Sequence, residues 1–390
     1  MNQAITHHTQ STTYLEPKPR YEILDGLRGV AAMLVVAFHL FESGFHNPST
    51  QWLNHGYLAV DFFFALSGFV VGYAYDDRWG RMSLTAFFKR RIVRLHPMVL
   101  FGCVWGACLF YWGIGPAFPA ITGTPWWQLV LLMLLGCTML PALLRWDIRG
   151  WAETYPLNGP QWSLMFEYIA NILYALVFRF LPKAVLAILV ALLAVNTLSL
   201  ALDWDWTGLL AGRGANAYTV IGGWNVTPTE LYVGFTRLLY PFLAGLLLSR
   251  LKWLLRLRAG FWWCALALFV LFAVPRPGGG EAGLANGLYE AFVIIVMLPL
   301  IVSAGAGSPI TGRRSVAVCK FLGDISYPLY ITHFPIVYLQ FAFVANHPDA
   351  PREQVIASGI GAYLAALFVA YAAMRLYDIP VRKWLRTKWL

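Results

Sequence analysis

The chain has 390 residues, of which 59% are apolar and 12% charged, and its mean hydropathy is +0.59. This balance excludes an ordinary soluble domain, in which roughly a quarter of the residues are charged. The formal charge of +10 does not indicate nucleic-acid binding, because the basic residues lie in short clusters between long apolar runs, as membrane topology signals do. We therefore expect an all-α, polytopic integral membrane protein.

The first 22 residues are polar and precede every apolar run. They lack the apolar core of a cleavable signal peptide. We expect residues 1–22 to form a flexible cytoplasmic arm and residues 23–390 to form one membrane domain.

Eleven runs approach the roughly 20 apolar residues that a membrane-spanning helix needs. They lie near residues 27–45, 56–75, 97–113, 126–145, 161–180, 182–202, 229–249, 259–275, 287–305, 327–345 and 354–377.

Charge parity reduces these runs to about ten spans, since cytoplasmic loops collect Lys and Arg. Five runs lie between residues 96 and 249, yet the basic segments at both ends should face the cytoplasm. One run therefore does not cross, and we expect it to be 126–145, a re-entrant or interfacial helix that Pro141 and Arg145 shorten. Both termini then lie inside. The strongly basic segments are 76–96, 249–258, 306–320 and 382–388.

The first run carries Arg28 and His39, eleven residues apart. This spacing places them on one helical face with about 16 Å of rise between them, which suits a long, thin ligand. Arginine binds phosphate with two parallel hydrogen bonds, and a neutral imidazole can take a hydroxyl proton near pH 7. The alternative is that neither residue binds a ligand: Arg28 extends its charged group to the membrane surface as a topology signal, and His39 is a hydrogen-bonded core residue.

Two carboxylates could orient His39 as the partner of a catalytic base. Asp61 lies in the second run together with Ser67, and Glu42 lies one turn beyond His39. An ionisable residue inside a span is a functional candidate until it is paired, but either carboxylate could instead only join helices.

The segment 83–97 alternates apolar and basic residues, which is typical of a helix lying on the inner membrane surface. Within it, Arg91 and Arg94 are three residues apart and could clamp an anion such as phosphate. Lys89 and Arg90 add positive charge. Any cytoplasmic loop can be basic, so this segment alone is weak evidence for a ligand.

The later runs hold three further groups of polar residues. The fifth run has Trp162 at its entrance and Glu167 within it, which could bind an acceptor hydroxyl or pair with an arginine. Arg375 and Asp378 are spaced to form a structural ion pair. The segment FLGDISYPLYITHFPIVY carries Asp324, Tyr330 and His333.

Together these segments resemble five motifs of the acyltransferase 3 family of membrane acyltransferases. The likeness runs from about residue 21 to 385, and five motifs in order are much more specific than any one. Asp378-Ile379-Pro380 departs from the family's more frequent Glu-x-Pro but keeps the charge and the proline. The matching positions are Leu24, Asp25 and Arg28 with His39; Asp61, Ser67, Gly68 and Phe69; Arg91, Arg94 and Pro97; Trp162 to Glu167; and Ser326, Tyr327, Tyr330, His333 and Pro335.

The resemblance implies an enzyme of the bacterial inner membrane that uses acyl-CoA, usually acetyl-CoA, as a cosubstrate, without a metal or a permanently bound cofactor. It implies acceptors such as glycans, lipid-linked sugars, peptidoglycan or small molecules such as macrolides. It also implies that Arg28 and His39 are essential. The loop 203–228, rich in Trp, Asn and Gly, modestly favours a saccharide, although aromatic residues at an interface are commonly anchors.

Our mechanistic hypothesis is that the CoA phosphates bind Arg28 and residues 89–94, while His39 deprotonates an acceptor hydroxyl that attacks the thioester. An acyl-histidine intermediate remains an alternative, and the oligomeric state stays open. A proton-coupled transporter using Asp61, His39 and Glu167 would also explain the buried charges, as would a scaffold whose polar residues join helices. The spacing of Arg28 and His39 beside a basic segment favours the acyltransferase.

Overall fold

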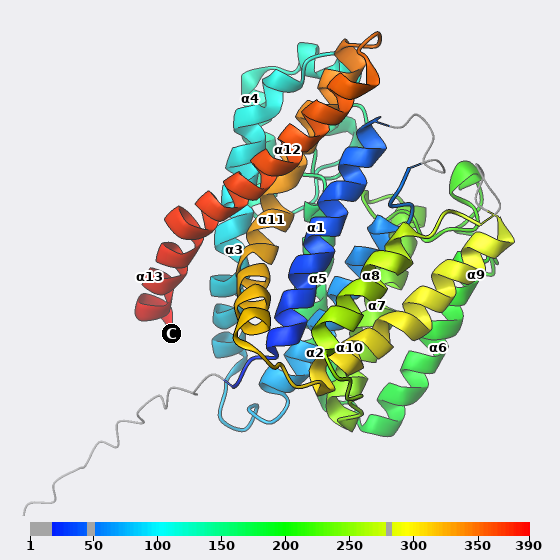
Figure 1. The fold of residues 1–390 in the computed structure, drawn as a ribbon, viewed down its shortest axis with the longest axis vertical. Coiled ribbons are helices and arrows are strands. Elements are labelled where there is room, and N and C mark those ends of the chain that lie inside the picture. Colours follow the sequence, from blue (N-terminus) through cyan, green and yellow to red (C-terminus); the bar gives the residue numbers. More distant parts are fainter. Residues whose placement is uncertain (1–17, 45–50, 278–282) are drawn as a thin grey trace, which may run out of the picture.

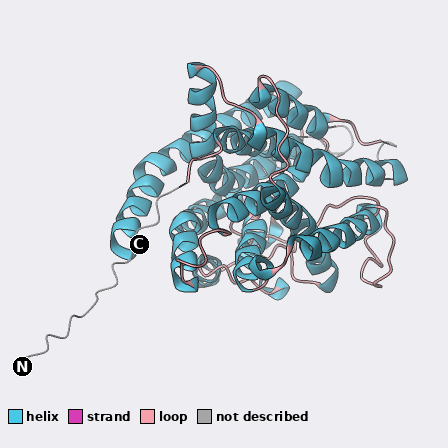
Figure 2. Ribbon diagram, turned by 90° about the horizontal axis from the view of Figure 1, so that it is seen from below, coloured by secondary structure: helices cyan, strands magenta, loops and turns pink. Residues whose placement is uncertain are grey.

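The computed structural model describes residues 18–44, 51–277 and 283–390, and in these ranges the chain consists of helices joined by loops, without a strand (Figures 1 and 2). The predicted all-α class is confirmed. Residues 1–17 of the predicted arm and residues 45–50 of the loop after the first run lie outside the described residues. The helices are α1 (Glu22–Gly44), α2 (Ala59–Tyr75), α3 (Leu84–Leu109), α4 (Trp126–Cys137), α5 (Gln161–Leu176), α6 (Lys183–Ala201), α7 (Pro228–Leu251), α8 (Gly260–Ala273), α9 (Leu284–Phe292), α10 (Leu298–Gly307), α11 (Arg313–Asn346), α12 (Arg352–Ala373) and α13 (Ile379–Trp389).

Within the described ranges, eight helical segments are long and apolar enough to cross a membrane, fewer than the ten spans predicted. The difference lies in α5 and α8, which have 16 and 14 residues. α8 ends at Ala273, two residues before Pro275, which lacks a backbone N–H and disfavours helical geometry in the residue before it. α5 ends at Leu176, because Val177 leaves helical geometry (φ −129°) and a short 3₁₀ turn, Phe178–Phe180, follows. The eight segments are Glu22–Gly44, Gly56–Tyr75, Leu84–Gly113, Lys183–Ala201, Pro228–Leu251, Leu284–Gly307, Arg313–Asn346 and Arg352–Trp389.

The four basic segments lie at one end of the molecule, the lower end in Figure 1, which we call the basic end. The connections α2–α3, α7–α8 and α10–α11 lie there, as does α13. The opposite end is called the far end. Segregation of Lys and Arg to one end is the pattern that the positive-inside rule predicts for a membrane protein.

The chain between α3 and α5 stays at the far end. α4 has only 12 residues, too few for a span, and its core residues Leu129 and Leu132 pack with Phe334 and Val337 from the later part of α11. This agrees with the prediction that the run near 126–145 does not cross.

The separate surface helix predicted over residues 83–97 was wrong. Residues 84–109 form one continuous helix, α3, with Pro97 inside it. Phe87, Val93 and Leu95 of its first half are buried in the bundle, so packing keeps this part of the helix in line with the rest. The basic residues therefore line the start of a span.

Two helix pairs form the centre of the bundle, α1 with α11 and α2 with α7. Small residues allow the backbones to approach closely, as is common in membrane helices. A Cβ at Gly68 would lie 1.8 Å from the carbonyl oxygen of Phe242, and one at Gly29 would lie 2.4 Å from that of Leu322. The helices on either side of the site described below are therefore held in fixed register.

Candidate active site

A cavity of about 770 Å³ opens at the basic end, and its walls come from α1, α2, α3, α5, α11 and α13. Its lining positions on α2 run from Tyr75 to Val60, which corresponds to about 22 Å of helix rise. The cavity is therefore long as well as wide, and it reaches well into the bundle.

Positive charge predominates in this cavity. Of its described lining side chains, ten are basic and five acidic. Excess positive charge between low-dielectric walls attracts anions. The basic residues are Lys18, Arg20, Arg28, Arg78, Arg90, Arg91, Arg94, Lys320, Arg382 and Arg386, and the acidic ones are Glu22, Asp25, Glu167, Asp324 and Asp378.

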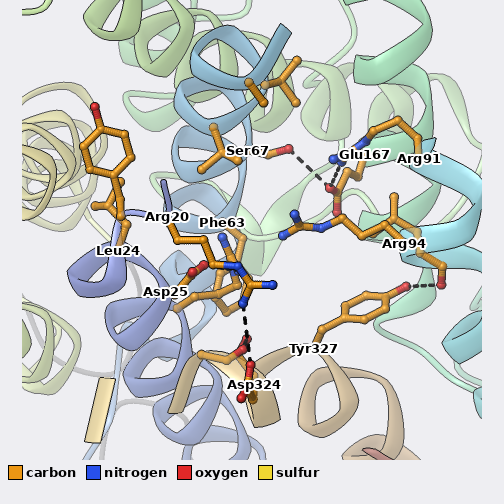
Figure 3. Close-up of a pocket in the computed structure, with 18 of the residues that line it drawn as sticks. Arg20, Leu24, Asp25, Phe63, Ser67, Arg91, Arg94, Glu167, Asp324 and Tyr327 are labelled. Atoms are coloured by element: carbon orange, nitrogen blue, oxygen red, sulfur yellow. Dashed lines mark hydrogen bonds and ion pairs between the residues drawn. The ribbon is translucent and has the colours of Figure 1, made fainter. Parts of the chain in front are cut away.

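Two of the predicted phosphate-binding arginines already have carboxylate partners. Arg28 lies 3.0 Å from Asp25, and Arg91 donates to Glu167 at 2.9 Å. Ser67 donates to the same Glu167 oxygen at 3.3 Å, so the predicted pairing of Glu167 with an arginine is confirmed (Figure 3). These pairs hold the two guanidinium groups in place at the cavity wall.

Arg94 differs from its neighbours, because among the described residues it has no carboxylate within ion-pair distance. Its guanidinium extends from α3 into the cavity (Figure 3). Arg90 also lines the cavity, whereas Lys89 is exposed and does not. Arg94 is thus the predicted arginine that is most available to an anionic ligand.

The inner end of the cavity is closed by a pair of hydroxyl groups. Those of Ser163 and Tyr330 lie 2.7 Å apart, and the ring of Phe63 packs edge-on against Tyr330. His39 is not among the lining residues. The cavity that Arg28 lines therefore stops short of the predicted base.

His39 has the geometry of an oriented imidazole base. Its Nδ1 lies 3.0 Å from a carboxylate oxygen of Glu42. A carboxylate oxygen accepts the hydrogen bond of Nδ1–H, and a neutral imidazole held in this way has its lone pair on Nε2. The side chains of His39 and Glu42 are 20% and 40% exposed, so this pair is accessible although the cavity does not reach it.

His333 lies between His39 and the inner end of the cavity. Its ring is stacked 5.8 Å from that of His39 and lies 5.9 Å from that of Tyr330. Its Nδ1 donates to the carbonyl oxygens of Leu329 and Tyr330, at 3.1 and 3.0 Å. Its Nε2 is buried without a partner in the described structure, so Tyr330, His333 and His39 form a short path from the cavity to the exposed pair.

Asp61 does not orient His39, because it is fully buried and pairs with Arg237 at 2.7 Å. Arg237 also donates to the carbonyl oxygens of Tyr57 and Gly222, and its guanidinium lies 5.4 Å from the ring of Trp162. Asp61 and Trp162 thus join α2, α5 and α7. Of the two predicted orienting carboxylates, Glu42 is the one that contacts His39.

Sequence reasoning missed Arg237 and the two α13 arginines, Arg382 and Arg386. Arg237 could have been found, since it is an ionisable residue in the middle of the run 229–249. The predicted pair of Arg375 with Asp378 was wrong: Asp378 pairs with Arg382, and Arg375 donates to the hydroxyl of Tyr371. A π-helical turn at Met374–Asp378 changes the helical phase and separates the two predicted partners. No cluster of metal-ligating residues occurs in the described parts of the chain.

Comparison with known proteins identifies the class of this membrane protein as an acyltransferase. Residues 21–375 match the Acyl_transf_3 family, described as an acyltransferase domain, and the chain belongs to this family. The resemblance seen in the motifs is thereby confirmed. No solved structure matches the chain.

Several curated proteins are similar to the chain over different lengths. The acyltransferase MdmB of Streptomyces mycarofaciens is 26% identical over 91% of this chain and 88% of its own length. Protein 2 in the picA locus of Rhizobium radiobacter is 32% identical over 47% of this chain and 94% of its own length. The O-acetyltransferase OatA of Staphylococcus aureus is 39% identical, but over only 21% of this chain and 13% of its own length.

Proposed function

We propose that the protein transfers an acyl group, acetyl in the first instance, from acyl-CoA to a hydroxyl group of a saccharide or glycolipid. The observation that carries this proposal is the long cationic cavity, whose inner end lies next to the path Tyr330, His333 and His39. Acyl-CoA has phosphates at one end and a thioester at the other, so its charge distribution matches that of the cavity.

The donor enters from the basic end, which faces the cytoplasm of a bacterium in this proposal, with both termini on that side. Its phosphates bind Arg94 and the paired Arg28 and Arg91, since arginine forms charge-assisted, bidentate hydrogen bonds with phosphate. The pantetheine arm then extends between α2 and α11. This pose brings the thioester to Ser163 and Tyr330 at the inner end.

His39 acts as the general base, oriented by Glu42. Its Nε2 removes the proton of the acceptor hydroxyl, whose oxygen attacks the thioester carbonyl. The CoA thiolate leaves and receives the proton from the imidazolium, so the step balances without a cofactor. The donor complex requires the space beside Tyr330 to become continuous with His39, through a shift of Tyr330 and His333.

The acceptor approaches from the far end, where the His39–Glu42 pair is exposed. The loop between α6 and α7 contributes two tryptophans, Trp204 and Trp206, which are 58% and 71% exposed. Aromatic faces of this kind stack on sugar rings, which favours a saccharide acceptor, free or lipid-linked.

The test uses the purified, lipid-reconstituted protein with acetyl-CoA labelled in the acetyl group. We expect label to reach a hydroxyl-bearing acceptor, and we expect His39→Ala to lower turnover by about a hundredfold to ten-thousandfold, the range that a positioned general base supplies. The variant should elute and unfold as the wild type does.

Two results would overturn the proposal. Undiminished turnover in His39→Ala would show that His39 is not the general base. Failure of the folded wild-type protein to consume acetyl-CoA, with glycolipid extracts supplied as acceptor, would remove the reaction itself.

A further inference from the structure

The C-terminal helix α13 forms part of the cavity wall at the basic end. It packs against α3, the helix that carries Arg91 and Arg94. Arg382 and Arg386, one helical turn apart on the same face, line the cavity. Lys383 and Lys388 of the same helix are exposed and do not line it. α13 therefore presents two of its basic side chains, Arg382 and Arg386, to the cavity.

The π-helical turn before α13 sets this orientation. Asp378, its last residue, is 1% exposed, lines the cavity and pairs with Arg382. Arg375, three residues earlier, is exposed and bonds to Tyr371 instead. The inserted π turn thus directs the carboxylate inward and brings the following arginines to the cavity wall. Such turns are rare and are frequent at functional sites.

The charges around Asp378 do not balance. The electrostatic neighbours of this carboxylate are Arg382, Arg386 and Arg94. Elsewhere on the cavity wall, by contrast, Arg28 and Arg91 each have a carboxylate of their own. Asp378 alone does not balance the charge of three arginines, and a polyanionic ligand would neutralise the excess of guanidinium groups beside it.

We propose that Arg382 and Arg386 recognise the phosphorylated nucleoside end of the acyl-CoA donor and so determine donor specificity. This inference rests on the proposed function. If the thioester is to reach Ser163 and Tyr330, the nucleotide lies toward the basic end, where α13 supplies Arg382, paired with Asp378, and Arg386, which has no ion pair among the described residues. The phosphate monoester on the ribose carries more charge than either phosphate of the diphosphate bridge, and it is the group that these arginines bind.

The test compares three acetyl donors with the reconstituted protein in zwitterionic phosphatidylcholine: acetyl-CoA, acetyl-3′-dephospho-CoA and S-acetylpantetheine, which has no nucleotide. For the double variant Arg382→Gln/Arg386→Gln we expect the KM for acetyl-CoA to rise at least tenfold, with kcat within twofold of the wild type. We expect the KM for S-acetylpantetheine to stay within twofold. The wild type itself should prefer acetyl-CoA to the dephospho donor, and the double variant should lose this preference.

The matched control is Lys383→Gln/Lys388→Gln, which removes the same charge from positions of α13 that do not line the cavity and should leave all three KM values unchanged. The single variant Arg386→Gln keeps the ion pair between Asp378 and Arg382. It should show a smaller rise in the KM for acetyl-CoA, and it tests the inference if the double variant does not fold.

Three outcomes would overturn the inference: an equal effect of the lysine variant, an equal rise in KM for S-acetylpantetheine, or an effect that occurs only when anionic lipid is added, because the arginines would then bind lipid headgroups. A wild-type protein that uses none of the three donors would instead refute the proposed function.

Discussion

Asp61 and Arg237 near the far end, and Arg28, Arg91 and Arg94 of the cavity at the basic end, are all ionisable residues within membrane helices, but their surroundings differ. Arg237 makes an ion pair with Asp61 and donates to two carbonyl oxygens. Nearby, the buried Glu290 accepts hydrogen bonds from Tyr57, Thr219, Asn286 and the backbone N–H of Val220. At the basic end, positive side chains outnumber negative ones two to one.

This contrast separates structural from functional charge. A buried charge whose hydrogen bonds are all satisfied within the chain has no capacity left for a ligand and stabilises the fold through its partners. In a cationic cavity with too few carboxylates, the excess positive charge is neutralised only when an anion binds. Burial of an ionisable residue therefore marks a candidate, and its partners decide what it does.

The largest effect on stability should follow from breaking the buried pair. We expect Asp61→Ala to lower the free energy of unfolding by about 3–5 kcal/mol, because it leaves Arg237 buried without its counter-charge. Thermal unfolding of the purified protein would measure this loss. The double variant Asp61→Leu/Arg237→Met, which removes both charges, should recover most of it. If the double variant is stable but inactive, Asp61 or Arg237 acts in the reaction. The buried pair would then not be purely structural.

A smaller effect, on binding rather than folding, is expected at the cavity. Arg94→Gln should weaken CoA binding roughly tenfold to a hundredfold, since a hydrogen bond to a charged group contributes about 1.5–3 kcal/mol, while the unfolding temperature stays that of the wild type. Calorimetric titration with CoA measures the affinity. Arg256→Gln, an exposed change at the basic end outside the cavity, is the control. Unchanged affinity in Arg94→Gln would show that the cavity does not hold the phosphates.

The smallest of these effects is expected at Glu42. Replacing it with Gln removes the charge that stabilises the imidazolium but leaves an oxygen to accept from Nδ1, so kcat should fall by at least about tenfold, less than for His39→Ala, with KM unchanged. Steady-state rates measured across pH would check this. The exposed Glu353→Gln, on α12, should have no effect. An unchanged pH profile in Glu42→Gln would mean that the contact with His39 plays no part in catalysis.

Much of the architecture could be predicted from the sequence, since span length, the run that does not cross and the basic end follow from apolar run length and from the positions of Lys and Arg. The two short helices α5 and α8 were not recognised, because their apolar runs continue past the points where the helices end. A hydropathy window measures composition, whereas a helix end depends on local backbone geometry and nearby proline.

Residues within one helix were easier to interpret than contacts between helices. The spacing of His39 and Glu42 predicted that they could pair, and in the structure the His39 imidazole contacts the Glu42 carboxylate. Asp61 could not be assigned, because its partner Arg237 lies 176 residues away and only tertiary packing brings the two together. The role of α13 depends on a single π turn. This turn rotates the residues that follow it so that Arg382 and Arg386 line the cavity, and it has no distinct sequence signature.

With the protein inserted as proposed, the hydrogen-bonded hydroxyls of Ser163 and Tyr330 and the buried His333 behind them also bear on the permeability of the membrane. A solvent-filled cleft on one side and an accessible imidazole on the other would together form a leak for protons if nothing separated them. In the proposed orientation, these three side chains would form the barrier between the two compartments. Any enlargement of the cleft by substitution at Tyr330 would thus risk dissipating the electrochemical gradient of the host membrane, whatever it did to turnover.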